Sequence, residues 1–391
     1  METYILAKGL HAPYNLGEAV ILRNLVRVMF EVYGDQLKVI SLVDHSRYQR
    51  SVTDPRVSYV EPTCNFYVDS LRVAVQALRS IPARKSRATS IHVSGISHLA
   101  AMSILRQIGG KLRLIPHFYL LQHSYMTRHF AELNNLSLHI QSRLASGAIT
   151  TSPAIASALK SFGFGQVHHI PPPTDVEALR PGDKRLGVKR LNRDLQLSIN
   201  VDSFVMVYLG HINPLRFPYE VLLRAARMLG SKGVPWEFVV LTPSFRRNAL
   251  FAKEVLESAK NLRVSDRVHI AVVDLAEDAK AAAYNAGDLV LFPSHGPTAV
   301  DPPLTVLEAM ACGRVVLASP VQSVPLVITQ NENGLLADFR SPKETCELMY
   351  SLYRDEERRG RIGAKARSLM VDQYSMDKVK EKICTLAFGN S

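Results

Sequence analysis

The sequence predicts an α/β protein with two doubly wound domains, each built on a parallel sheet. The chain has 391 residues, which exceeds one ordinary domain core, so length alone favours two domains. Short apolar runs alternate with stretches of helical periodicity in both halves, and this alternation is typical of parallel sheets with helices on both faces. A proline-rich break near the middle separates the two series of elements.

The first series begins close to the N-terminus. Short apolar runs predict buried strands at residues 4–7, 37–43, 91–94, 112–116 and 147–151. Apolar residues at helical spacing predict helices over residues 18–31, 67–80 and 97–107.

The break follows at Pro171-Pro172-Pro173-Thr174-Asp175, which can be neither helix interior nor central strand. With the charged stretch 181–194 behind it, this region is the best candidate for an interdomain linker. We therefore expect a first domain over 1–180 and a second over 181–372. The remaining residues, 373–391, are expected to form a helix that packs back on the first domain.

The second series resembles the first. Strands are expected at residues 204–208, 238–241, 268–273, 289–292 and 315–318, and helices at 218–229, 343–354 and 358–374. Ligands of open α/β sheets bind outside the carboxyl ends of the strands, so the loops after these strands are the first places to look for a site.

Composition narrows the class of protein. No apolar run reaches about 18 residues, and the N-terminus lacks the features of a secretion signal. The four cysteines are scattered without metal-ligand spacing, which fits a reducing cytoplasm. We therefore expect a cytoplasmic protein without a zinc site or a disulfide framework.

Charge is placed unevenly along the chain. Residues 1–170 hold 18 Lys and Arg against 9 Asp and Glu, whereas residues 171–391 hold 29 against 26. A positive field of this kind attracts phospholipid headgroups, lipid phosphates or nucleic acid. The alternative is a solvated basic face with no partner.

The most informative segment reads DPPLTVLEAMACG at residues 301–313. Asp301 is suited to an N-cap, prolines are common in a first helical turn and Gly313 suits the end, so a helix is expected over 302–312. Its start is a ready anion site, where the Leu304 and Thr305 amides and the Thr305 hydroxyl could bind a phosphate. The alternative is that Asp301 caps these amides and nothing binds.

Glu308 lies among apolar residues of that expected helix. A carboxylate in such surroundings needs hydrogen-bond partners, because burying it bare is costly. One carboxylate can accept from two hydroxyls, so a sugar diol of a bound ligand is a natural partner. The alternative is a glutamate that only complements the helix dipole.

Residues in three further segments are candidates for ligand contacts. Gly210, His211 and Arg216 lie in the loop after the strand at 204–208, and Arg makes charge-assisted bonds to phosphate. His117 follows the strand at 112–116, and Gly17 in the first loop would allow a ligand close to the backbone. Each has a structural alternative: a surface salt bridge for the arginine, a capping or core role for the histidines, and a plain turn for Gly17.

Taken in order, these segments resemble the family 4 glycosyltransferases of the GT-B fold. The similarity rests on the Gly210-His211 loop with Arg216, on DLVLFPS at 288–294 and on LEAMACG at 307–313. SPA at 152–154, the proline-rich region at 171–181 and NGLL at 333–336 extend it over nearly the whole chain. It is strong over residues 204–375 and looser before residue 150.

The resemblance implies two Rossmann-like domains facing across a cleft. It also implies a retaining transferase that uses a nucleoside-diphosphate sugar as co-substrate and no metal or other cofactor. Arg216 matches the family's diphosphate-binding lysine, and His211 stands where the family usually has arginine. Glu308 matches the glutamate placed on the nucleotide ribose, His117 a cleft histidine near the reacting carbon, and Gly17 the glycine of the first loop.

One departure concerns the sugar. The family has a pair of glutamates, of which Glu308 matches the second; the first lies eight residues earlier and contacts the donor sugar, and this chain has Val300 there. Asp301 is adjacent and could substitute in a shifted loop. Pro302 and Pro303 also replace the family's usual Phe-Gly.

The sequence thus predicts a hexosyltransferase with a lipid-linked or phosphate-bearing acceptor. We expect it in the cytoplasm, peripheral on the inner face of the membrane, with no nucleic acid partner. The catalytic residues are expected to be His117, Arg216 and Glu308; the donor-binding residues are expected to be Gly17, Gly210, His211, Arg216, Asp301, Leu304, Thr305 and Glu308.

Other functions remain open. A nucleotide-sugar epimerase of the same fold would act on the donor alone, and a non-catalytic scaffold, suggested by Val300, would neither transfer nor hydrolyse it. A dinucleotide-dependent oxidoreductase and a serine hydrolase lack support, because neither G-x-G-x-x-G after a first strand nor G-x-S-x-G occurs.

Overall fold

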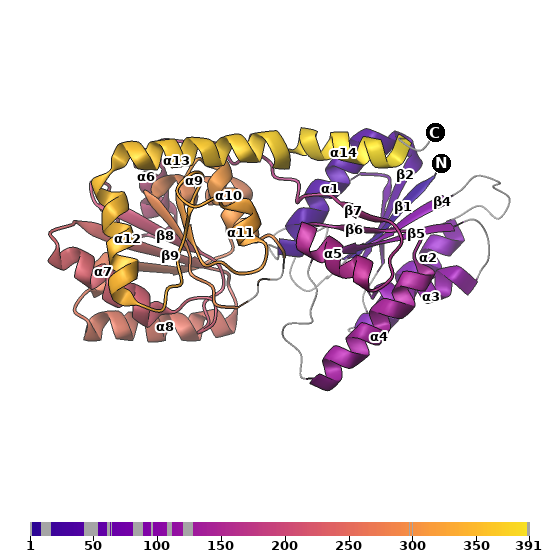
Figure 1. Ribbon diagram of the computed structural model, residues 1–391, viewed down its shortest axis with the longest axis horizontal. Coiled ribbons are helices and arrows are strands. Elements are labelled where there is room, and N and C mark those ends of the chain that lie inside the picture. The colour runs from indigo at the N-terminus through magenta and orange to yellow at the C-terminus, as the bar shows by residue number, and fades with distance from the viewer. Residues whose placement is uncertain are drawn as a thin grey trace. The chain divides into compact units, whose positions relative to one another are not determined.

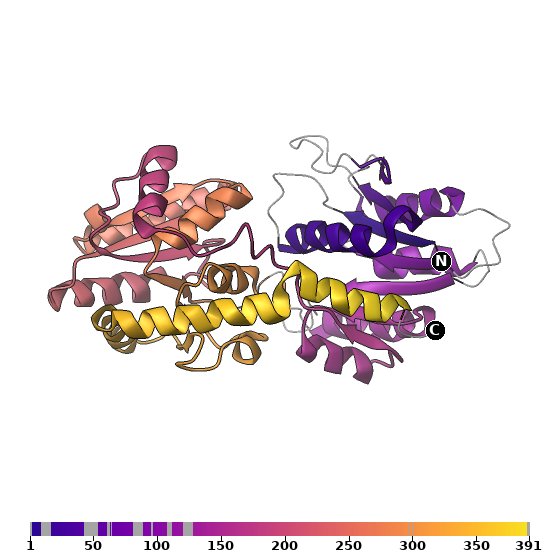
Figure 2. The ribbon, with the colours of Figure 1, turned by 90° about the horizontal axis from the view of Figure 1, so that it is seen from above.

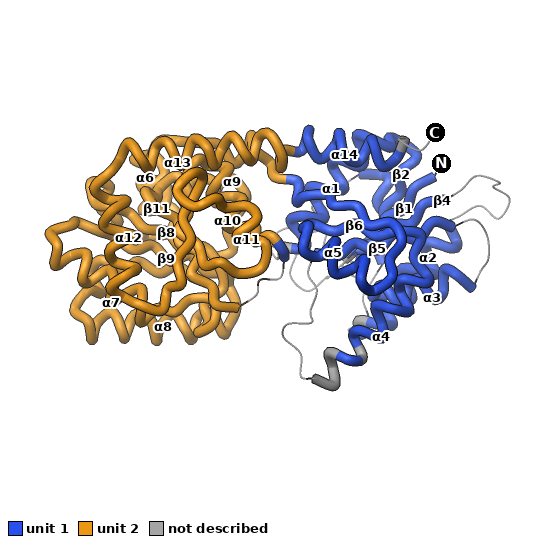
Figure 3. Tube along the Cα trace, viewed as in Figure 1, with its two compact units in different colours: residues 1–173, 299–301, 376–391 blue, residues 174–298, 302–375 orange. Residues whose placement is uncertain are grey.

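The structure is a computed structural model that describes residues 2–8, 17–42, 54–60, 63, 65–80, 89–94, 97–107, 112–119, 128–296, 298 and 300–388. The chain forms two compact units (Figure 3). Unit 1 comprises residues 1–173, 299–301 and 376–391, and unit 2 comprises residues 174–298 and 302–375. The C-terminal segment and three residues of a late loop therefore group with the first half of the chain.

Unit 1 is built on one parallel sheet. Its strands are β1 (Thr3–Lys8), β2 (Leu37–Leu42), β3 (Val57–Val60), β4 (Thr89–Val93), β5 (Leu112–Phe118), β6 (Ala148–Thr150) and β7 (Val167–His169). In the described part of the unit they lie in the order β3-β2-β1-β4-β5-β6-β7, and every neighbouring pair is parallel.

Helices cover both faces of this sheet. They are α1 (Gly17–Tyr33), α2 (Phe66–Ser80), α3 (His98–Gln107), α4 (Arg128–Leu144), α5 (Pro153–Ser161) and α14 (Met376–Phe388). Alternate residues of β1 face opposite ways: Ile5 packs in a core with α1 and α14, and Leu6 in a core with α2 and α3. In both ribbon views α14 lies beside α1 (Figures 1 and 2).

Unit 2 repeats the plan. Its strands are β8 (Phe204–Leu209), β9 (Trp236–Thr242), β10 (Val268–Val272), β11 (Leu289–Phe292), β12 (Val316–Ala318) and β13 (Leu335–Leu336). Within the described residues they form a parallel sheet in the order β10-β9-β8-β11-β12-β13. The order reverses direction between β8 and β11, which is where ligands of doubly wound sheets bind.

The helices of unit 2 also lie on both faces. They are α6 (Lys184–Leu195), α7 (Tyr219–Ser231), α8 (Arg246–Asn261), α9 (Glu277–Ala286), α10 (Leu304–Ala311), α11 (Val324–Val327), α12 (Pro342–Arg354) and α13 (Glu356–Leu369). Met206 of β8 packs with α7, α8 and α12, and Val207 packs with α6 and α9. The two expected doubly wound domains are therefore confirmed.

The expected helix over residues 358–374 is confirmed, because α13 continues into a π-helix at Met370–Tyr374. One expectation for a segment is wrong. Residues 181–194 are not a free linker, because most of them form α6, whose Val188 and Leu191 are buried in unit 2. Helix α6 was hard to predict from the sequence because it is highly charged and its apolar face has only a few residues.

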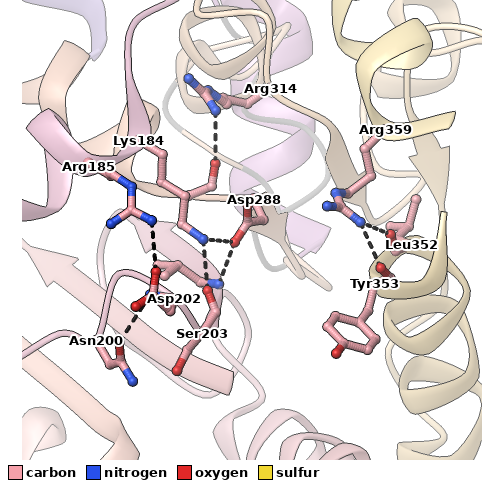
Figure 4. A network of polar contacts seen from close by, with 12 residues as sticks. Lys184, Arg185, Asn200, Asp202, Ser203, Asp288, Arg314, Leu352, Tyr353 and Arg359 are labelled. Carbon is pink, nitrogen blue, oxygen red and sulfur yellow. Dashed lines mark hydrogen bonds and ion pairs between the residues drawn. The ribbon is translucent and has the colours of Figure 1, made fainter. Parts of the chain in front are cut away.

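Figure 4 shows how α6 is held at the amino ends of β8 and β11. Lys184 Nζ donates to an Asp288 carboxylate oxygen over 2.6 Å and to the Ser203 carbonyl over 2.8 Å. The Val205 amide donates to the same Asp288 oxygen over 2.8 Å. This network lies at the edge of the sheet opposite the loops that follow the strands, so it stabilises the unit without occupying the expected site.

No helix in the described ranges is both long enough and apolar enough to span a bilayer.

Candidate functional site

The loop after β8 lies at the carboxyl edge of the unit 2 sheet. The Tyr208 hydroxyl donates to the His211 carbonyl over 2.6 Å and closes the start of the loop. A Cβ on Gly210 would lie 3.1 Å from that hydroxyl, a distance at which the tyrosine must shift. Gly210 therefore belongs to this turn because the backbone passes close to a buried ring.

His211 is fixed by a side chain that the sequence analysis did not single out. Asn248 Nδ2 lies 3.2 Å from His211 Nδ1 and also donates to the Pro243 carbonyl over 2.8 Å. An amide nitrogen can only donate, so His211 Nδ1 accepts and Nε2 carries the proton. Burial lowers the pKa of His211, and nearby Arg216 lowers it further, so the ring is a neutral N–H donor.

Arg216 is half-buried in the same loop. Asn213 Oδ1 accepts from the backbone amides of Leu215 and Arg216, each over 3.0 Å, which fixes the turn that carries the guanidinium. Burial raises the pKa of Tyr208, and the positive charge of Arg216 lowers it in part. The loop thus places a cation and a neutral N–H donor near each other.

The next segment, at the start of α10, differs from expectation. The N-cap is Pro303, without a side-chain cap bond, so the expectation that Asp301 caps this helix is wrong. The cap bonds run from the Val306 and Leu307 amides to the Pro303 carbonyl. Leu304 and Thr305 occupy the first two helical positions, whose amides have no acceptor within the helix itself.

Asp301 is instead bonded within unit 1. Its carboxylate accepts from the Ser152 hydroxyl over 2.9 Å, and its carbonyl accepts from the Thr151 hydroxyl over 2.5 Å. Its amide donates to the Tyr119 carbonyl over 2.8 Å. The contact of Asp301 with a sugar stays a prediction.

Glu308 is buried with 5% of its surface exposed and lies in a network with α9. Its Oε1 lies 3.3 Å from Lys280 Nζ, and its Oε2 accepts from the Tyr284 hydroxyl over 2.7 Å. Thr305, one turn earlier on α10, donates its hydroxyl to the Leu209 carbonyl over 3.1 Å. These bonds bring Glu308, Thr305 and the end of β8 together at one edge of the sheet.

Burial and neighbouring charges shift the pKa values of Glu308 and Lys280 in opposite directions. Burial raises the pKa of Glu308, and the positive Lys280 offsets part of that rise. Burial alone would lower the pKa of Lys280, but Glu308 and the half-exposed Glu277 raise it, so the ammonium stays charged. Each carboxylate oxygen of Glu308 can accept a second hydrogen bond, which leaves capacity for two ligand hydroxyls.

His117, the expected cleft histidine, lies in unit 1 at the end of β5 and has 2% of its surface exposed. It contacts His92 of the neighbouring strand β4, with 2.9 Å between His92 Nδ1 and His117 Nε2. Gly17 begins α1, and the loop before it lies outside the described residues. The structure thus places Gly210, His211, Arg216, Leu304, Thr305 and Glu308 in unit 2, and Gly17, His117 and Asp301 in unit 1.

Three buried polar side chains of this region were not predicted from the sequence. Lys280, Tyr284 and Asn248 are polar residues buried in helices. The signal for the first two was their spacing of four residues, which places both on one face of α9. The described residues contain no group of three or more His, Cys, Asp or Glu side chains arranged to hold a metal ion.

Comparisons with known proteins agree with the predicted class. Residues 203–355 match the family model of the glycosyl transferases group 1. A D-inositol 3-phosphate glycosyltransferase from Segniliparus rotundus is 27% identical over 194 residues, which are 50% of this chain and 40% of that protein. The match thus spans less than half the length of this curated relative.

Solved structures match over the whole chain. HepE of Anabaena, in complex with UDP, has a TM-score of 0.76 at 16% identity, and 100% of both chains is covered. Sucrose-phosphate synthase of Thermosynechococcus elongatus also has a TM-score of 0.76 at 16% identity with full coverage of both chains. HepE has also been solved with UDP-glucose.

These likenesses define the class as the GT-B fold, which confirms the predicted fold class. Over residues 203–355 the chain matches the glycosyl transferases group 1 model, and about half of the chain is similar to curated glycosyltransferases.

The buried ion pair gives a stability prediction. Glu308→Ala leaves the Lys280 ammonium without its buried partner, and Lys280→Met leaves the Glu308 carboxylate without its cation. We expect each single change to destabilise unit 2 by about 3–5 kcal/mol. The double variant should lose less than the sum, by about 1–3 kcal/mol of coupling energy.

Denaturant titration of the four proteins in this double-mutant cycle measures the coupling. The exposed pair Arg185–Asp202 provides the matched control, for which a coupling of about 1 kcal/mol or less is expected. Additive effects of the two changes at Glu308 and Lys280 would contradict the network.

The buried histidines give a pH prediction. Burial lowers the pKa of His92 to about 3, so below pH 6.5 the unfolded chain binds a proton that the folded chain does not. Stability should therefore fall as pH drops from 6.5, by about 1.4 kcal/mol per pH unit from this residue. Unfolding of the wild type and of His92→Asn at pH 7.5 and 5.5 tests this, and equal losses in both proteins would refute it.

Proposed function

We propose that this protein transfers a hexose-type sugar from a nucleoside-diphosphate sugar to an acceptor, with retention of configuration and without a catalytic metal. The observation that carries the proposal is the edge of unit 2, where Glu308, Thr305 and the Gly210–Arg216 loop come together inside the glycosyl transferases group 1 domain. HepE, which shares the fold, binds UDP and UDP-glucose, so uridine nucleotides are the first donors to test.

Each group at this edge has a role that its chemistry suits. Glu308 accepts from the two ribose hydroxyls, since each of its oxygens has capacity for one more hydrogen bond. Arg216, the Nε2–H of His211, and the Leu304 and Thr305 amides stabilise the negative charge that develops on the leaving diphosphate. Lys280 keeps its contact with Glu308 and balances the negative charge of that carboxylate.

Retention needs no carboxylate nucleophile in this scheme. As the resemblance implies, the leaving phosphate helps to remove the proton of the acceptor hydroxyl. His117 orients donor and acceptor near the anomeric carbon, and Asp301 contacts a sugar hydroxyl.

The acceptor is proposed to carry a phosphate or a lipid-linked phosphate. The Segniliparus relative is named for inositol 3-phosphate, and the first 170 residues carry twice as many cationic as anionic side chains. A basic domain of this kind favours an anionic acceptor or the inner face of a membrane.

Removing the proposed contact between Arg216 and the donor diphosphate tests the proposed transfer reaction. Arg216→Ala should lower transfer from a nucleotide sugar about 10²-fold, because one charge-assisted donor to the leaving group is lost. Arg224→Ala removes the same charge from an exposed position on α7 and should leave transfer unchanged. Product analysis with and without acceptor measures both.

The outcomes separate the alternatives. Wild-type transfer by Arg216→Ala would contradict the assigned site. A changed sugar that forms from the donor alone would favour an epimerase, and an inactive wild-type protein would favour a scaffold.

Membrane association gives an independent prediction. Co-sedimentation with vesicles that contain anionic phospholipid should be strong at low salt and should weaken several-fold at high salt, because the attraction is screened within about 10 Å at 0.1 M. Vesicles of zwitterionic lipid are the control. Absence of binding to anionic vesicles at low salt would argue against a peripheral location.

A further inference from the structure

Helix α2 of unit 1 has apolar side chains on two opposite faces. On one face Val73, Ala74 and Ala77 are fully buried in a core with β1, β2, β4 and α3. On the opposite face the side chains of Val68 and Val75 lie at the surface, where the two residues are 42% and 37% exposed. A helix that is apolar on all sides is normally buried on all sides, so the exposed valines point to a partner outside the unit.

The apolar residues of the exposed face are grouped. Val68 and Val75 are seven residues apart, which is about two turns, so they lie on one line along the helix. Tyr67, which is 66% exposed, and the half-buried Leu71 and Leu78 lie along one side of this line. Scattered apolar side chains are ordinary on a protein surface, whereas a group on one face indicates an interaction surface.

Two arginines lie along the other side of the valines. Arg72 and Arg79 are both exposed and are again seven residues apart. The one acidic residue of α2, Asp69, is buried, and its carboxylate accepts from the amide and the hydroxyl of Thr63, each over 2.7 Å. The sequence of the adjacent helix α3 contains no acidic residue (Figure 1). The exposed face of α2 is therefore apolar along one side and positively charged along the other.

This combination fits the surface of an anionic bilayer. Aliphatic side chains enter the boundary between headgroups and acyl chains, and tyrosine is favoured at that boundary because its ring is apolar and its hydroxyl is polar. Arginine side chains lay their stems along apolar surface and reach lipid phosphates with their guanidinium groups. A protein partner would need an acidic residue placed opposite each arginine, whereas an anionic bilayer offers negative charge all over its surface.

We propose that the exposed face of α2 docks unit 1 on anionic phospholipid. That the reaction takes place at a membrane rests on the proposed function, whereas the contact of α2 with lipid does not depend on sugar transfer. The contact is shallow, because the other face of α2 stays packed on the sheet and only the exposed side chains reach the headgroup region.

Co-sedimentation of the full chain with vesicles of phosphatidylcholine and phosphatidylglycerol tests this surface. Val68→Glu combined with Val75→Glu should lower the partition coefficient about tenfold or more, because two apolar contacts are lost and two anions face the lipid. Arg72→Gln and Arg79→Gln should each lower it about fivefold. Glutamate is a good helix former, so the circular dichroism spectrum and the unfolding midpoint of the double variant should match those of the wild type.

Leu136→Glu combined with Ile140→Glu is the matched control. These residues are 56% and 40% exposed on α4 of the same unit, and the change adds the same charge. Because the field of distant charges is screened, binding should fall by less than about threefold. Equal losses in the two double variants would overturn the proposal, since net charge alone would then explain them.

The contact with lipid can also be measured directly. The chain has one tryptophan, Trp236, which is buried in unit 2. Tyr67→Trp therefore adds one accessible indole, whose fluorescence should be quenched by vesicles that contain brominated phospholipid. Leu136→Trp places the same reporter on α4 and should not be quenched. Vesicle-bound protein in which Tyr67→Trp is not quenched would also overturn the proposal.

The proposed function and the docking surface fail in different ways. If the wild type transfers no sugar but loses vesicle binding on substitution of Val68 and Val75, the proposed function fails and the docking surface stands. If the wild type transfers sugar but ignores anionic vesicles at low salt, the docking surface is refuted and the exposed face of α2 is left to a protein partner.

Discussion

A buried carboxylate is the constraint around which the unit 2 site is arranged. Glu308 could not remain in the apolar helix α10 without partners, because the cost of burying a bare charge is several kcal/mol. Lys280 and Tyr284 of α9 supply these partners on one side. On the same helix, Thr305 bonds to the end of β8, so the position of the loop at 210–216 relative to α10 depends on the same small set of bonds.

The sequence predicted much of this arrangement, because its strands are short apolar runs and its helices have clear periodicity. It missed β3, β7 and β13, which have only four, three and two residues, too few for an alternating pattern. It also took the charged α6 for a linker. Partners of the site residues were harder to predict, because Lys280 and Asn248 are polar residues whose burial depends on tertiary packing and not on local sequence.

The two halves of the expected donor site differ in how firmly they are supported. The residues proposed for the nucleotide and the diphosphate share one edge of one unit. The residue proposed for the sugar does not fit as simply, because Val300 occupies the position of the family's glutamate and Asp301 is its neighbour.

Thermal unfolding in the presence of a panel of nucleoside diphosphates and their sugars tests the central claim most directly. Ligands that bind the folded state raise its melting temperature by mass action. The account predicts that one nucleoside diphosphate stabilises the wild type and that Glu308→Gln, which preserves the shape of the side chain, loses most of that shift. No shift of the wild type with any nucleotide, or an equal shift in Glu308→Gln, would contradict the assignment of Glu308 to the donor.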